Sequence, residues 1–261
     1  MKKAILSSMV LDRHPFLQRL SQHVELAAND IAKLESIIER EISVRRKHEL
    51  VVAGSEYRKL CFVKDGNAVR YQMLRNGKRH ILDVILPGDV IGVPNSFYER
   101  AAYPVIAVNS LTISVCRLDD YLELCYQRPQ FAFALCWLAL QEATTHAERV
   151  IGHSRRTPVE QLSHFILEVH ARLRSVGLAK EETFALPFSQ EIIADLLGLS
   201  TPHLNRVMQQ LKSQELVAGG DGQLKILDRE TLKSIAHYDP PELLPIPLAK
   251  AGLPSKQVAI L

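Results

Sequence analysis

The sequence of 261 residues is poor in cysteine, and its few cysteines have no paired spacing. They stand at Cys61, Cys116, Cys125 and Cys136, with no Cys-x-x-Cys motif. This spacing is typical of neither a disulfide framework nor a metal site, so we expect reduced thiols that are buried or have no functional role. An iron–sulfur or redox-sensing role is the alternative use of such thiols.

The sequence also lacks a strong net charge and long apolar runs. A formal charge of +3 is too small to indicate a nucleic-acid partner by bulk electrostatics. The longest fully apolar run, Phe131–Leu140, is about half the length of a membrane-spanning helix. The opening MKKAILSSMVL has a short apolar run broken by serines and no signal cleavage site. These features predict a soluble cytoplasmic protein with no membrane association, large enough for two domains.

Two patterns divide the first half of the chain. Residues 12–48 carry helix-like apolar spacing. Residues 50–117 are short runs rich in Val, Ile and Tyr, interrupted at intervals of about ten by VKDGN, LRNGK and LPGD. Asn76-Gly77 is the strongest hairpin signal. Evenly spaced strands of this kind predict an antiparallel β barrel or jelly roll.

A long helix is expected to begin at Pro129, because proline is tolerated in a first helical turn. Steps of four and three residues along it form a heptad seam. The seam residues are Phe133, Trp137, Leu140, Thr144, Ala147 and Ile151. This pattern favours a parallel two-helix dimer, and the alternative is a core helix packed on the barrel. The segment GHSRRTP at 152–158 predicts the end of the helix, a hinge and the domain boundary.

The stretch LGLSTPHLNR, at 197–206, has the spacing of a helix-turn-helix. Counted from Gln190, a small residue (Ala194) falls at position five, glycine (Gly198) at nine and leucine (Leu204) at fifteen. The small residue allows close helix approach, and glycine can take the positive φ of the turn. Ser189 and Ser200 are suitable N-caps. The following LVAGGDGQLKIL predicts the hairpin of a winged helix.

The second helix of this motif is expected to enter the major groove of DNA. Arg206 is the main base-reading candidate, because a guanidinium group can donate two hydrogen bonds to guanine. The base-reading set is Thr201, Pro202, Asn205, Arg206 and Gln209. The expected phosphate contacts, which lie at helix N-termini, are Ser189, Gln190, Ser200 and His203.

Over residues 15–240 the chain resembles the Crp/Fnr family of bacterial transcription regulators. The resemblance rests on PGDVIG, on the long helix and above all on SQEIIADLLGLSTPHLNRVMQQLKSQELV. It implies an α+β fold with a cyclic-nucleotide-binding-like jelly roll and dimerisation helix (1–154, the helix at about 129–152). A winged helix-turn-helix (155–229) and an extension with a proline-rich tail (230–261) would follow. It also implies a homodimer on palindromic double-stranded DNA, and it admits RNA polymerase as a partner.

The chain departs from the family pattern at positions that recognise ligands. The family's base-reading arginine falls on Arg206, but Pro202 replaces its usual acidic neighbour, so a different half-site preference is expected. Val93 and Pro94 stand where cyclic-AMP binders have Glu-Leu, and Ala101 follows Arg100 where serine is expected. We therefore expect loss of cyclic AMP binding. The effector stays unknown, Arg100 is at most a weak anion contact, and no cofactor or metal is expected.

Two other classes of function are considered. His164, Glu168 and His170 suggest a metal set of an enzyme, but His170 is rotated by about 200° from the other two on a helix. No nucleophile elbow, phosphate-binding loop or zinc motif accompanies them. A winged helix used only for protein–protein contact is the second alternative. The sequence favours a non-enzymatic DNA-binding regulator over both.

Overall fold

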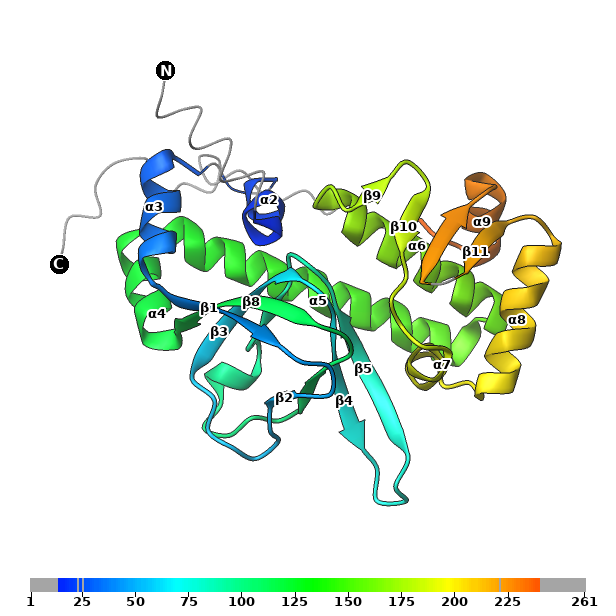
Figure 1. The fold of residues 1–261 in the computed structure, drawn as a ribbon, viewed down its shortest axis with the longest axis horizontal. Helices are drawn as coiled ribbons and strands as arrows, with labels where there is room; N and C mark the ends of the chain where they lie inside the picture. The colour runs from blue at the N-terminus through cyan, green and yellow to red at the C-terminus, as the bar shows by residue number, and fades with distance from the viewer. Residues whose placement is uncertain (1–13, 23, 25, 221, 240–261) are drawn as a thin grey trace.

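The structure, a computed structural model, describes residues 14–22, 24, 26–220 and 222–239. A β barrel occupies one side and a winged helix the other, and the long helix α5 (Pro129–Arg155) runs along both (Figure 1). This arrangement confirms the predicted α+β fold, with a jelly roll before the winged helix. None of the helices in the described part is long and apolar enough to cross a membrane.

The barrel consists of two four-stranded antiparallel sheets, in the orders β1-β8-β3-β6 and β2-β7-β4-β5. The strands are β1 (Ile38–Val44), β2 (Glu49–Val51), β3 (Lys59–Asp65), β4 (Ala68–Met73), β5 (Arg79–Ile85), β6 (Val90–Ile91), β7 (Val105–Ala107) and β8 (Leu111–Arg117). The hairpin predicted at Asn76-Gly77 joins β4 to β5. Aliphatic side chains such as Val63, Ile85 and Ile113 fill the space between the sheets.

The helical prediction for residues 12–48 is only partly correct. Helices α2 (Pro15–Ser21) and α3 (Ala28–Ser36) form, but β1 then begins at Ile38, inside the segment expected to be helical. Ile42 and Val44 share the face of β1 that packs on the barrel core, and the strand pairs with β8 along its length. Pairing with a partner distant in the sequence outweighs the local spacing. Helix α4 (Leu118–Gln127), which was not predicted, covers the end of β8.

The helix end predicted within residues 152–158 is found there. Gly152 itself does not break the helix, because it lies buried inside α5, which continues to Arg155. One helical glycine costs only about 1 kcal/mol relative to alanine. Helix α5 ends instead because Pro158 disfavours the helical conformation in the residue before it. Thr157 and Glu160 form a capping box that starts α6 (Pro158–Ser175).

The winged helix follows the predicted order of elements. Its helices after α6 are α7 (Gln190–Leu197), α8 (Thr201–Ser213) and α9 (Arg229–Ala236). Its strands are β9 (Ala179–Lys180), β10 (Thr183–Ala185), β11 (Val217–Gly220) and β12 (Gln223–Ile226), in the sheet order β11-β12-β10-β9. The hairpin β11–β12 confirms the wing prediction. The proline-rich tail after residue 239 lies outside the described residues.

Candidate DNA-binding surface and its connection to the barrel

The turn between α7 and α8 has the geometry that the motif predicts. Gly198 takes a left-handed conformation with φ of 67°, which a side chain would strain. The Ser189 hydroxyl accepts a hydrogen bond from the backbone N–H of Ile192 at 3.3 Å. The Ser200 hydroxyl accepts one from the N–H of His203 at 3.4 Å. Both serines therefore cap the helices that they precede.

Buried leucine and valine side chains fix the rotation of α8. Leu204, Val207 and Leu211 pack into the core of the winged helix. Because these positions face inward, the helical period places Arg206 outward, and its side chain is exposed. The other candidates with exposed side chains are Ser189, Gln190, Ser200, Pro202 and Gln209.

Three candidate residues of α8 are only half exposed. Thr201, His203 and Asn205 lie at the edges of the outward face. The Oδ1 atom of Asn205 is buried and has no hydrogen-bond partner among the described residues. Asn205 is therefore a less direct candidate for base reading than Arg206. The predicted DNA-contacting residues all lie on α7 and α8 or at the N-caps of these helices.

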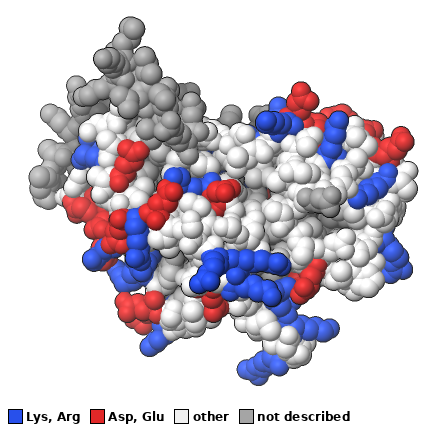
Figure 2. Space-filling view, in the orientation of Figure 1, with Lys and Arg blue, Asp and Glu red and all other residues white. Residues whose placement is uncertain are grey.

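Charge on the visible face is not concentrated over the winged helix. Figure 2 shows Lys and Arg gathered low on the barrel, whereas on the winged-helix side they are spaced among acidic and uncharged residues. Exposed cations of the barrel include Arg45, Arg46 and Lys47 in the turn after β1. On this face the winged helix therefore carries no broad basic surface.

The barrel touches the first helix of the helix-turn-helix directly. Arg79, on β5, donates hydrogen bonds to Asp195 at 2.8 Å and to Glu191 at 3.0 Å, both on α7. Beside it, the rings of His80 and His153 lie 5.7 Å apart. This contact connects the orientation of α7 to the β4–β5 hairpin.

A buried network of ion pairs joins the barrel, α5 and α6. Arg149, on α5, donates to Asp83 of β5 at 2.8 Å and to Glu168 of α6 at 2.9 Å. Arg172, also on α6, pairs with Glu168 and with Asp89 of the barrel. Arg19–Asp89 and Arg70–Glu142 extend the network on either side.

The network determines the charge state of its central carboxylate. Burial alone would raise the pKa of Asp83, but the guanidinium groups of Arg149, Arg172 and Arg70 hold that pKa well below its usual range. Asp83 is therefore ionised at neutral pH. Burial alone would lower the pKa of Arg149, but the carboxylates of Glu168 and Asp83 raise it above its usual value.

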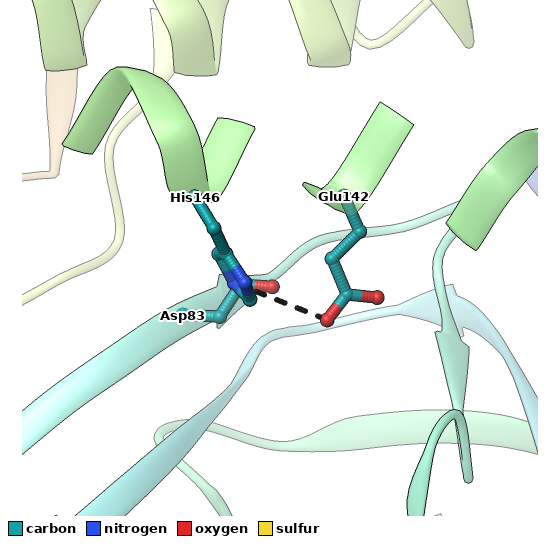
Figure 3. Close-up of side chains that lie close together, drawn as sticks. All are labelled: Asp83, Glu142 and His146. Atoms are coloured by element: carbon teal, nitrogen blue, oxygen red, sulfur yellow. Dashed lines mark ion pairs between the residues drawn. The ribbon is translucent and has the colours of Figure 1, made fainter. Parts of the chain in front are cut away.

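Asp83, Glu142 and His146 lie together and could each offer a metal-ligand atom (Figure 3). However, Asp83 already accepts from Arg149 and Glu142 from Arg70. A divalent cation would have to displace these guanidinium groups and would then be repelled by them. We assign the two carboxylates to the ion-pair network.

The helical set considered for an enzyme is not brought together. Glu168 accepts hydrogen bonds from Arg149 and Arg172. His164 lies 3.4 Å from a carboxylate oxygen of Glu148, on another helix. His170 is fully buried, with its Nε2 atom 2.7 Å from the backbone carbonyl of Glu181. These three side chains thus serve separate structural contacts.

The loop that corresponds to a nucleotide-binding turn is occupied by structural contacts. Arg100 donates to the backbone carbonyl of Gly54 at 2.9 Å. The backbone carbonyl of Val93 accepts from Arg70 at 2.7 Å. Ala101 is buried in the barrel core. The described loop therefore presents neither a carboxylate at Val93 nor a hydroxyl at Ala101.

Comparison with known proteins identifies the same two modules. The chain matches the cyclic nucleotide-binding domain over residues 41–128 and the Crp-like helix-turn-helix domain over residues 160–235. A barrel of this type joined to a DNA-binding winged helix defines a transcription regulator with a sensor-like domain. The chain belongs to the Crp/Fnr family of transcription regulators.

Relatives and solved structures agree with this assignment. The transcriptional activator Anr of Pseudomonas protegens is 26% identical over 218 residues, covering 82% of this chain and 87% of Anr. The nitrogen fixation regulation protein FixK of Bradyrhizobium diazoefficiens is 27% identical over 174 residues, covering 67% of this chain and 72% of FixK. The fold is similar to that of FixK2 from Bradyrhizobium japonicum, with a TM-score of 0.68 at 24% identity, over 75% of this chain and 96% of FixK2.

Proposed function

We propose that this regulator acts in the cytoplasm as a homodimer that binds palindromic double-stranded DNA through α8. The observation that carries the proposal is the rotation of α8, whose buried Leu204, Val207 and Leu211 leave Arg206 exposed. Arg206 reads a guanine, and Pro202, Thr201, Asn205 and Gln209 shape the neighbouring contacts. The protein regulates without catalysis, and RNA polymerase is a partner at its promoters.

The dimer seam lies on α5, but it is shifted from the predicted seam. Cys136, Ala143 and Val150 take the places predicted for Trp137, Thr144 and Ile151. Trp137 packs into the chain's own core, with Phe16, Tyr121 and Phe131, and Phe133 packs against the same cluster. The exposed stripe alternates steps of four and three residues, as a two-helix seam requires. It consists of Cys136, Leu140, Ala143, Ala147 and Val150, and Ile151 is exposed beside it.

The proposal predicts different effects for Arg206 and His203. Arg206→Ala should weaken the cognate site by roughly 1–3 kcal/mol and relax the preference at a single base pair. His203→Ala should weaken all sequences about equally, because a phosphate contact carries no base information. The measurement is a competition assay in which each base pair of the half-site is varied for wild type and both variants.

The same assay can contradict the assignment. If Arg206→Ala lowers the affinity of every sequence equally and keeps the base preference, Arg206 contacts only phosphate. If neither wild type nor the variants bind one duplex sequence more tightly than another at moderate salt, specific DNA binding is absent. The winged helix would then be a protein-contact module, which is the second function considered.

Ser200 offers a test of the phosphate contacts at the start of α8. Ser200→Ala should lower the free energy of unfolding by about 1 kcal/mol, because the N-cap acceptor is lost. Ser200→Asp should keep the cap but place a negative charge next to phosphate, so DNA affinity falls while stability is retained. Thermal unfolding by circular dichroism and DNA binding by fluorescence anisotropy measure the two effects. An aspartate variant that binds DNA as tightly as wild type would place Ser200 away from the backbone.

A further inference from the structure

A cleft of about 380 Å³ lies between α6 and α9 in the winged helix. Four of its lining residues come from the C-terminal end of α6 and two from α9: His170, Ala171, Arg174, Ser175, Arg229 and Lys233. Among the described residues, neither α7 nor α8 lines the cleft, so it is separate from the proposed DNA-binding surface. A volume of this size admits a small molecule.

Three cations, and no described carboxylate, line this cleft. Arg174 is exposed, and its guanidinium group has no hydrogen bond or ion pair among the described residues. Lys233 pairs with Glu230 at 3.4 Å, but Glu230 is 82% exposed, and a surface pair of this kind contributes little. Cations that face one cleft repel one another. A bound anion removes that repulsion.

The third cation, Arg229, is held in place by a buried histidine. Its Nη2 atom donates to His170 Nδ1 at 2.6 Å, and its Nε atom donates to Glu182 at 2.8 Å. Because a guanidinium group can only donate, the proton of His170 is on Nε2, which donates to the Glu181 carbonyl at 2.7 Å. Burial lowers the pKa of His170 and favours this neutral ring.

These contacts prepare Arg229 for a ligand. They use Nε and Nη2 and leave Nη1 without a hydrogen bond among the described residues. A flexible arginine loses side-chain entropy when a ligand immobilises it, but Arg229 is already immobilised, so this cost of binding is small. Two carboxylates, Glu182 and Glu230, pair with the three cations. One positive charge, on Arg174, is therefore left without a counterion in the described structure.

The arrangement of donors suits a phosphate group. Arg174 projects from α6, whereas Arg229 and Lys233 project from α9. A tetrahedral phosphate presents oxygens in several directions and can accept from all three side chains, two of which are guanidinium groups that match its geometry. A planar carboxylate is satisfied by one guanidinium group and would leave the other cations without an acceptor.

We propose that the cleft between α6 and α9 binds a phosphate group, of inorganic phosphate or of a small phosphate ester, and that the bound group stabilises the winged helix. The phosphate oxygens accept from Arg174, Arg229 and Lys233 and so connect α6 to α9. A ligand that binds only the folded protein raises its stability as the ligand concentration rises. DNA is not needed for this binding, which therefore stands apart from the proposed function.

The test titrates inorganic phosphate and glycerol 3-phosphate, separately, into the full-length protein in a phosphate-free buffer. Isothermal titration calorimetry should show one saturable site per chain, and the melting temperature should rise with ligand concentration. Arg174→Gln should weaken binding at least about tenfold, equivalent to about 1.4 kcal/mol. Because Arg174 is exposed and has no partner among the described residues, this variant should melt like wild type when phosphate is absent.

The matched control is Arg155→Gln, the same change at an exposed arginine that does not line the cleft. It should bind phosphate like wild type. If both variants weaken binding equally, the protein attracts phosphate only through its overall charge and the site is wrong. No saturable binding of either ligand also overturns the proposal.

Comparison of the ligands identifies the source of the phosphate group. Tighter binding of glycerol 3-phosphate assigns the cleft to a phosphate ester, and binding of inorganic phosphate alone assigns it to the free ion. Acetate, a planar monoanion, should not displace either ligand at equal concentration. Efficient displacement by acetate overturns the ligand class.

Arg206→Ala separates this cleft from the DNA-binding surface, where phosphate contacts are also expected. The variant should bind inorganic phosphate like wild type. If Arg206→Ala removes phosphate binding and Arg174→Gln does not, the phosphate lies on α8 and the cleft proposal is wrong. Absence of specific DNA binding in a protein that still binds phosphate overturns the proposed function alone.

Discussion

Arg149→Met is expected to lower the free energy of unfolding by about 3–5 kcal/mol, because it removes the hydrogen-bonded cation of buried Asp83 and leaves Glu168 with Arg172 alone. Arg149 donates to Asp83, to Glu168 and to the Leu82 carbonyl, and both carboxylates are less than one tenth exposed. Methionine fills similar space but donates no hydrogen bond. Urea unfolding at pH 7 measures the loss, followed by the fluorescence of Trp137, the single tryptophan, and by helical circular dichroism.

The cost of this substitution should depend on pH. The pKa of Asp83 is lower in the folded protein than its usual value, so its contribution is present above the unfolded pKa, near 3.9. That contribution is lost as the pH falls from about 4 toward the folded pKa. Because burial without Arg149 raises the pKa of Asp83 relative to wild type, the difference between wild type and Arg149→Met should be largest at pH 7 and should decrease as the pH falls.

Arg58→Met is the matched control for this experiment. Arg58 pairs with Asp119 on the surface, where both side chains are about half exposed, so its loss should change stability little. If Arg149→Met is no more destabilising than Arg58→Met, the buried network does not hold the barrel and α6 together. A loss that stays constant down to pH 3 would show that Asp83 is not the carboxylate responsible.

Leu140→Glu is expected to convert the protein to a monomer and to weaken binding of a palindromic duplex on the order of 100-fold or more. Leu140 is 60% exposed in the single chain, so glutamate there should not disturb folding. In a two-helix seam the same position would bury a charge against its symmetry mate. Loss of the second half-site removes the gain from simultaneous binding. Analytical ultracentrifugation and anisotropy on one- and two-half-site duplexes measure both effects.

The control is Leu122→Glu, at an exposed leucine on α4. It should remain dimeric and bind both duplexes like wild type. Cys136 supplies a second readout, because an exposed cysteine on the seam would face its symmetry mate and form a cross-link under mild oxidation. A Leu140→Glu protein that stays dimeric, or a wild type that is monomeric with DNA, would show that α5 is not the seam.

The helix-turn-helix was predicted well because its determinants are local. Ala194, Gly198 and Leu204 fix a turn through steric size, a positive φ and packing within one short segment. The serine caps and the wing hairpin depend on similar short-range rules. The position of Arg206 follows from the helical period once Leu204 and Val207 are recognised as buried.

The barrel boundaries were predicted less well because they depend on distant partners. Ile38–Val44 becomes a strand through its pairing with β8, although its spacing read alone resembles that of a helix. The seam register depends on Trp137, whose apolar ring satisfies the heptad pattern equally well whether it meets a partner or its own core. Local sequence contains no information that separates these two environments.

The sequence by itself determined the class of protein, its modules and the helix-turn-helix, since each follows from residues close together in the chain. Only the tertiary structure decided which charges meet. Asp83, Arg149 and Glu168 come from three elements and form one buried network. Burial and pairing arise from packing between elements, and for that reason the barrel's connection to α7 appears only in the folded chain.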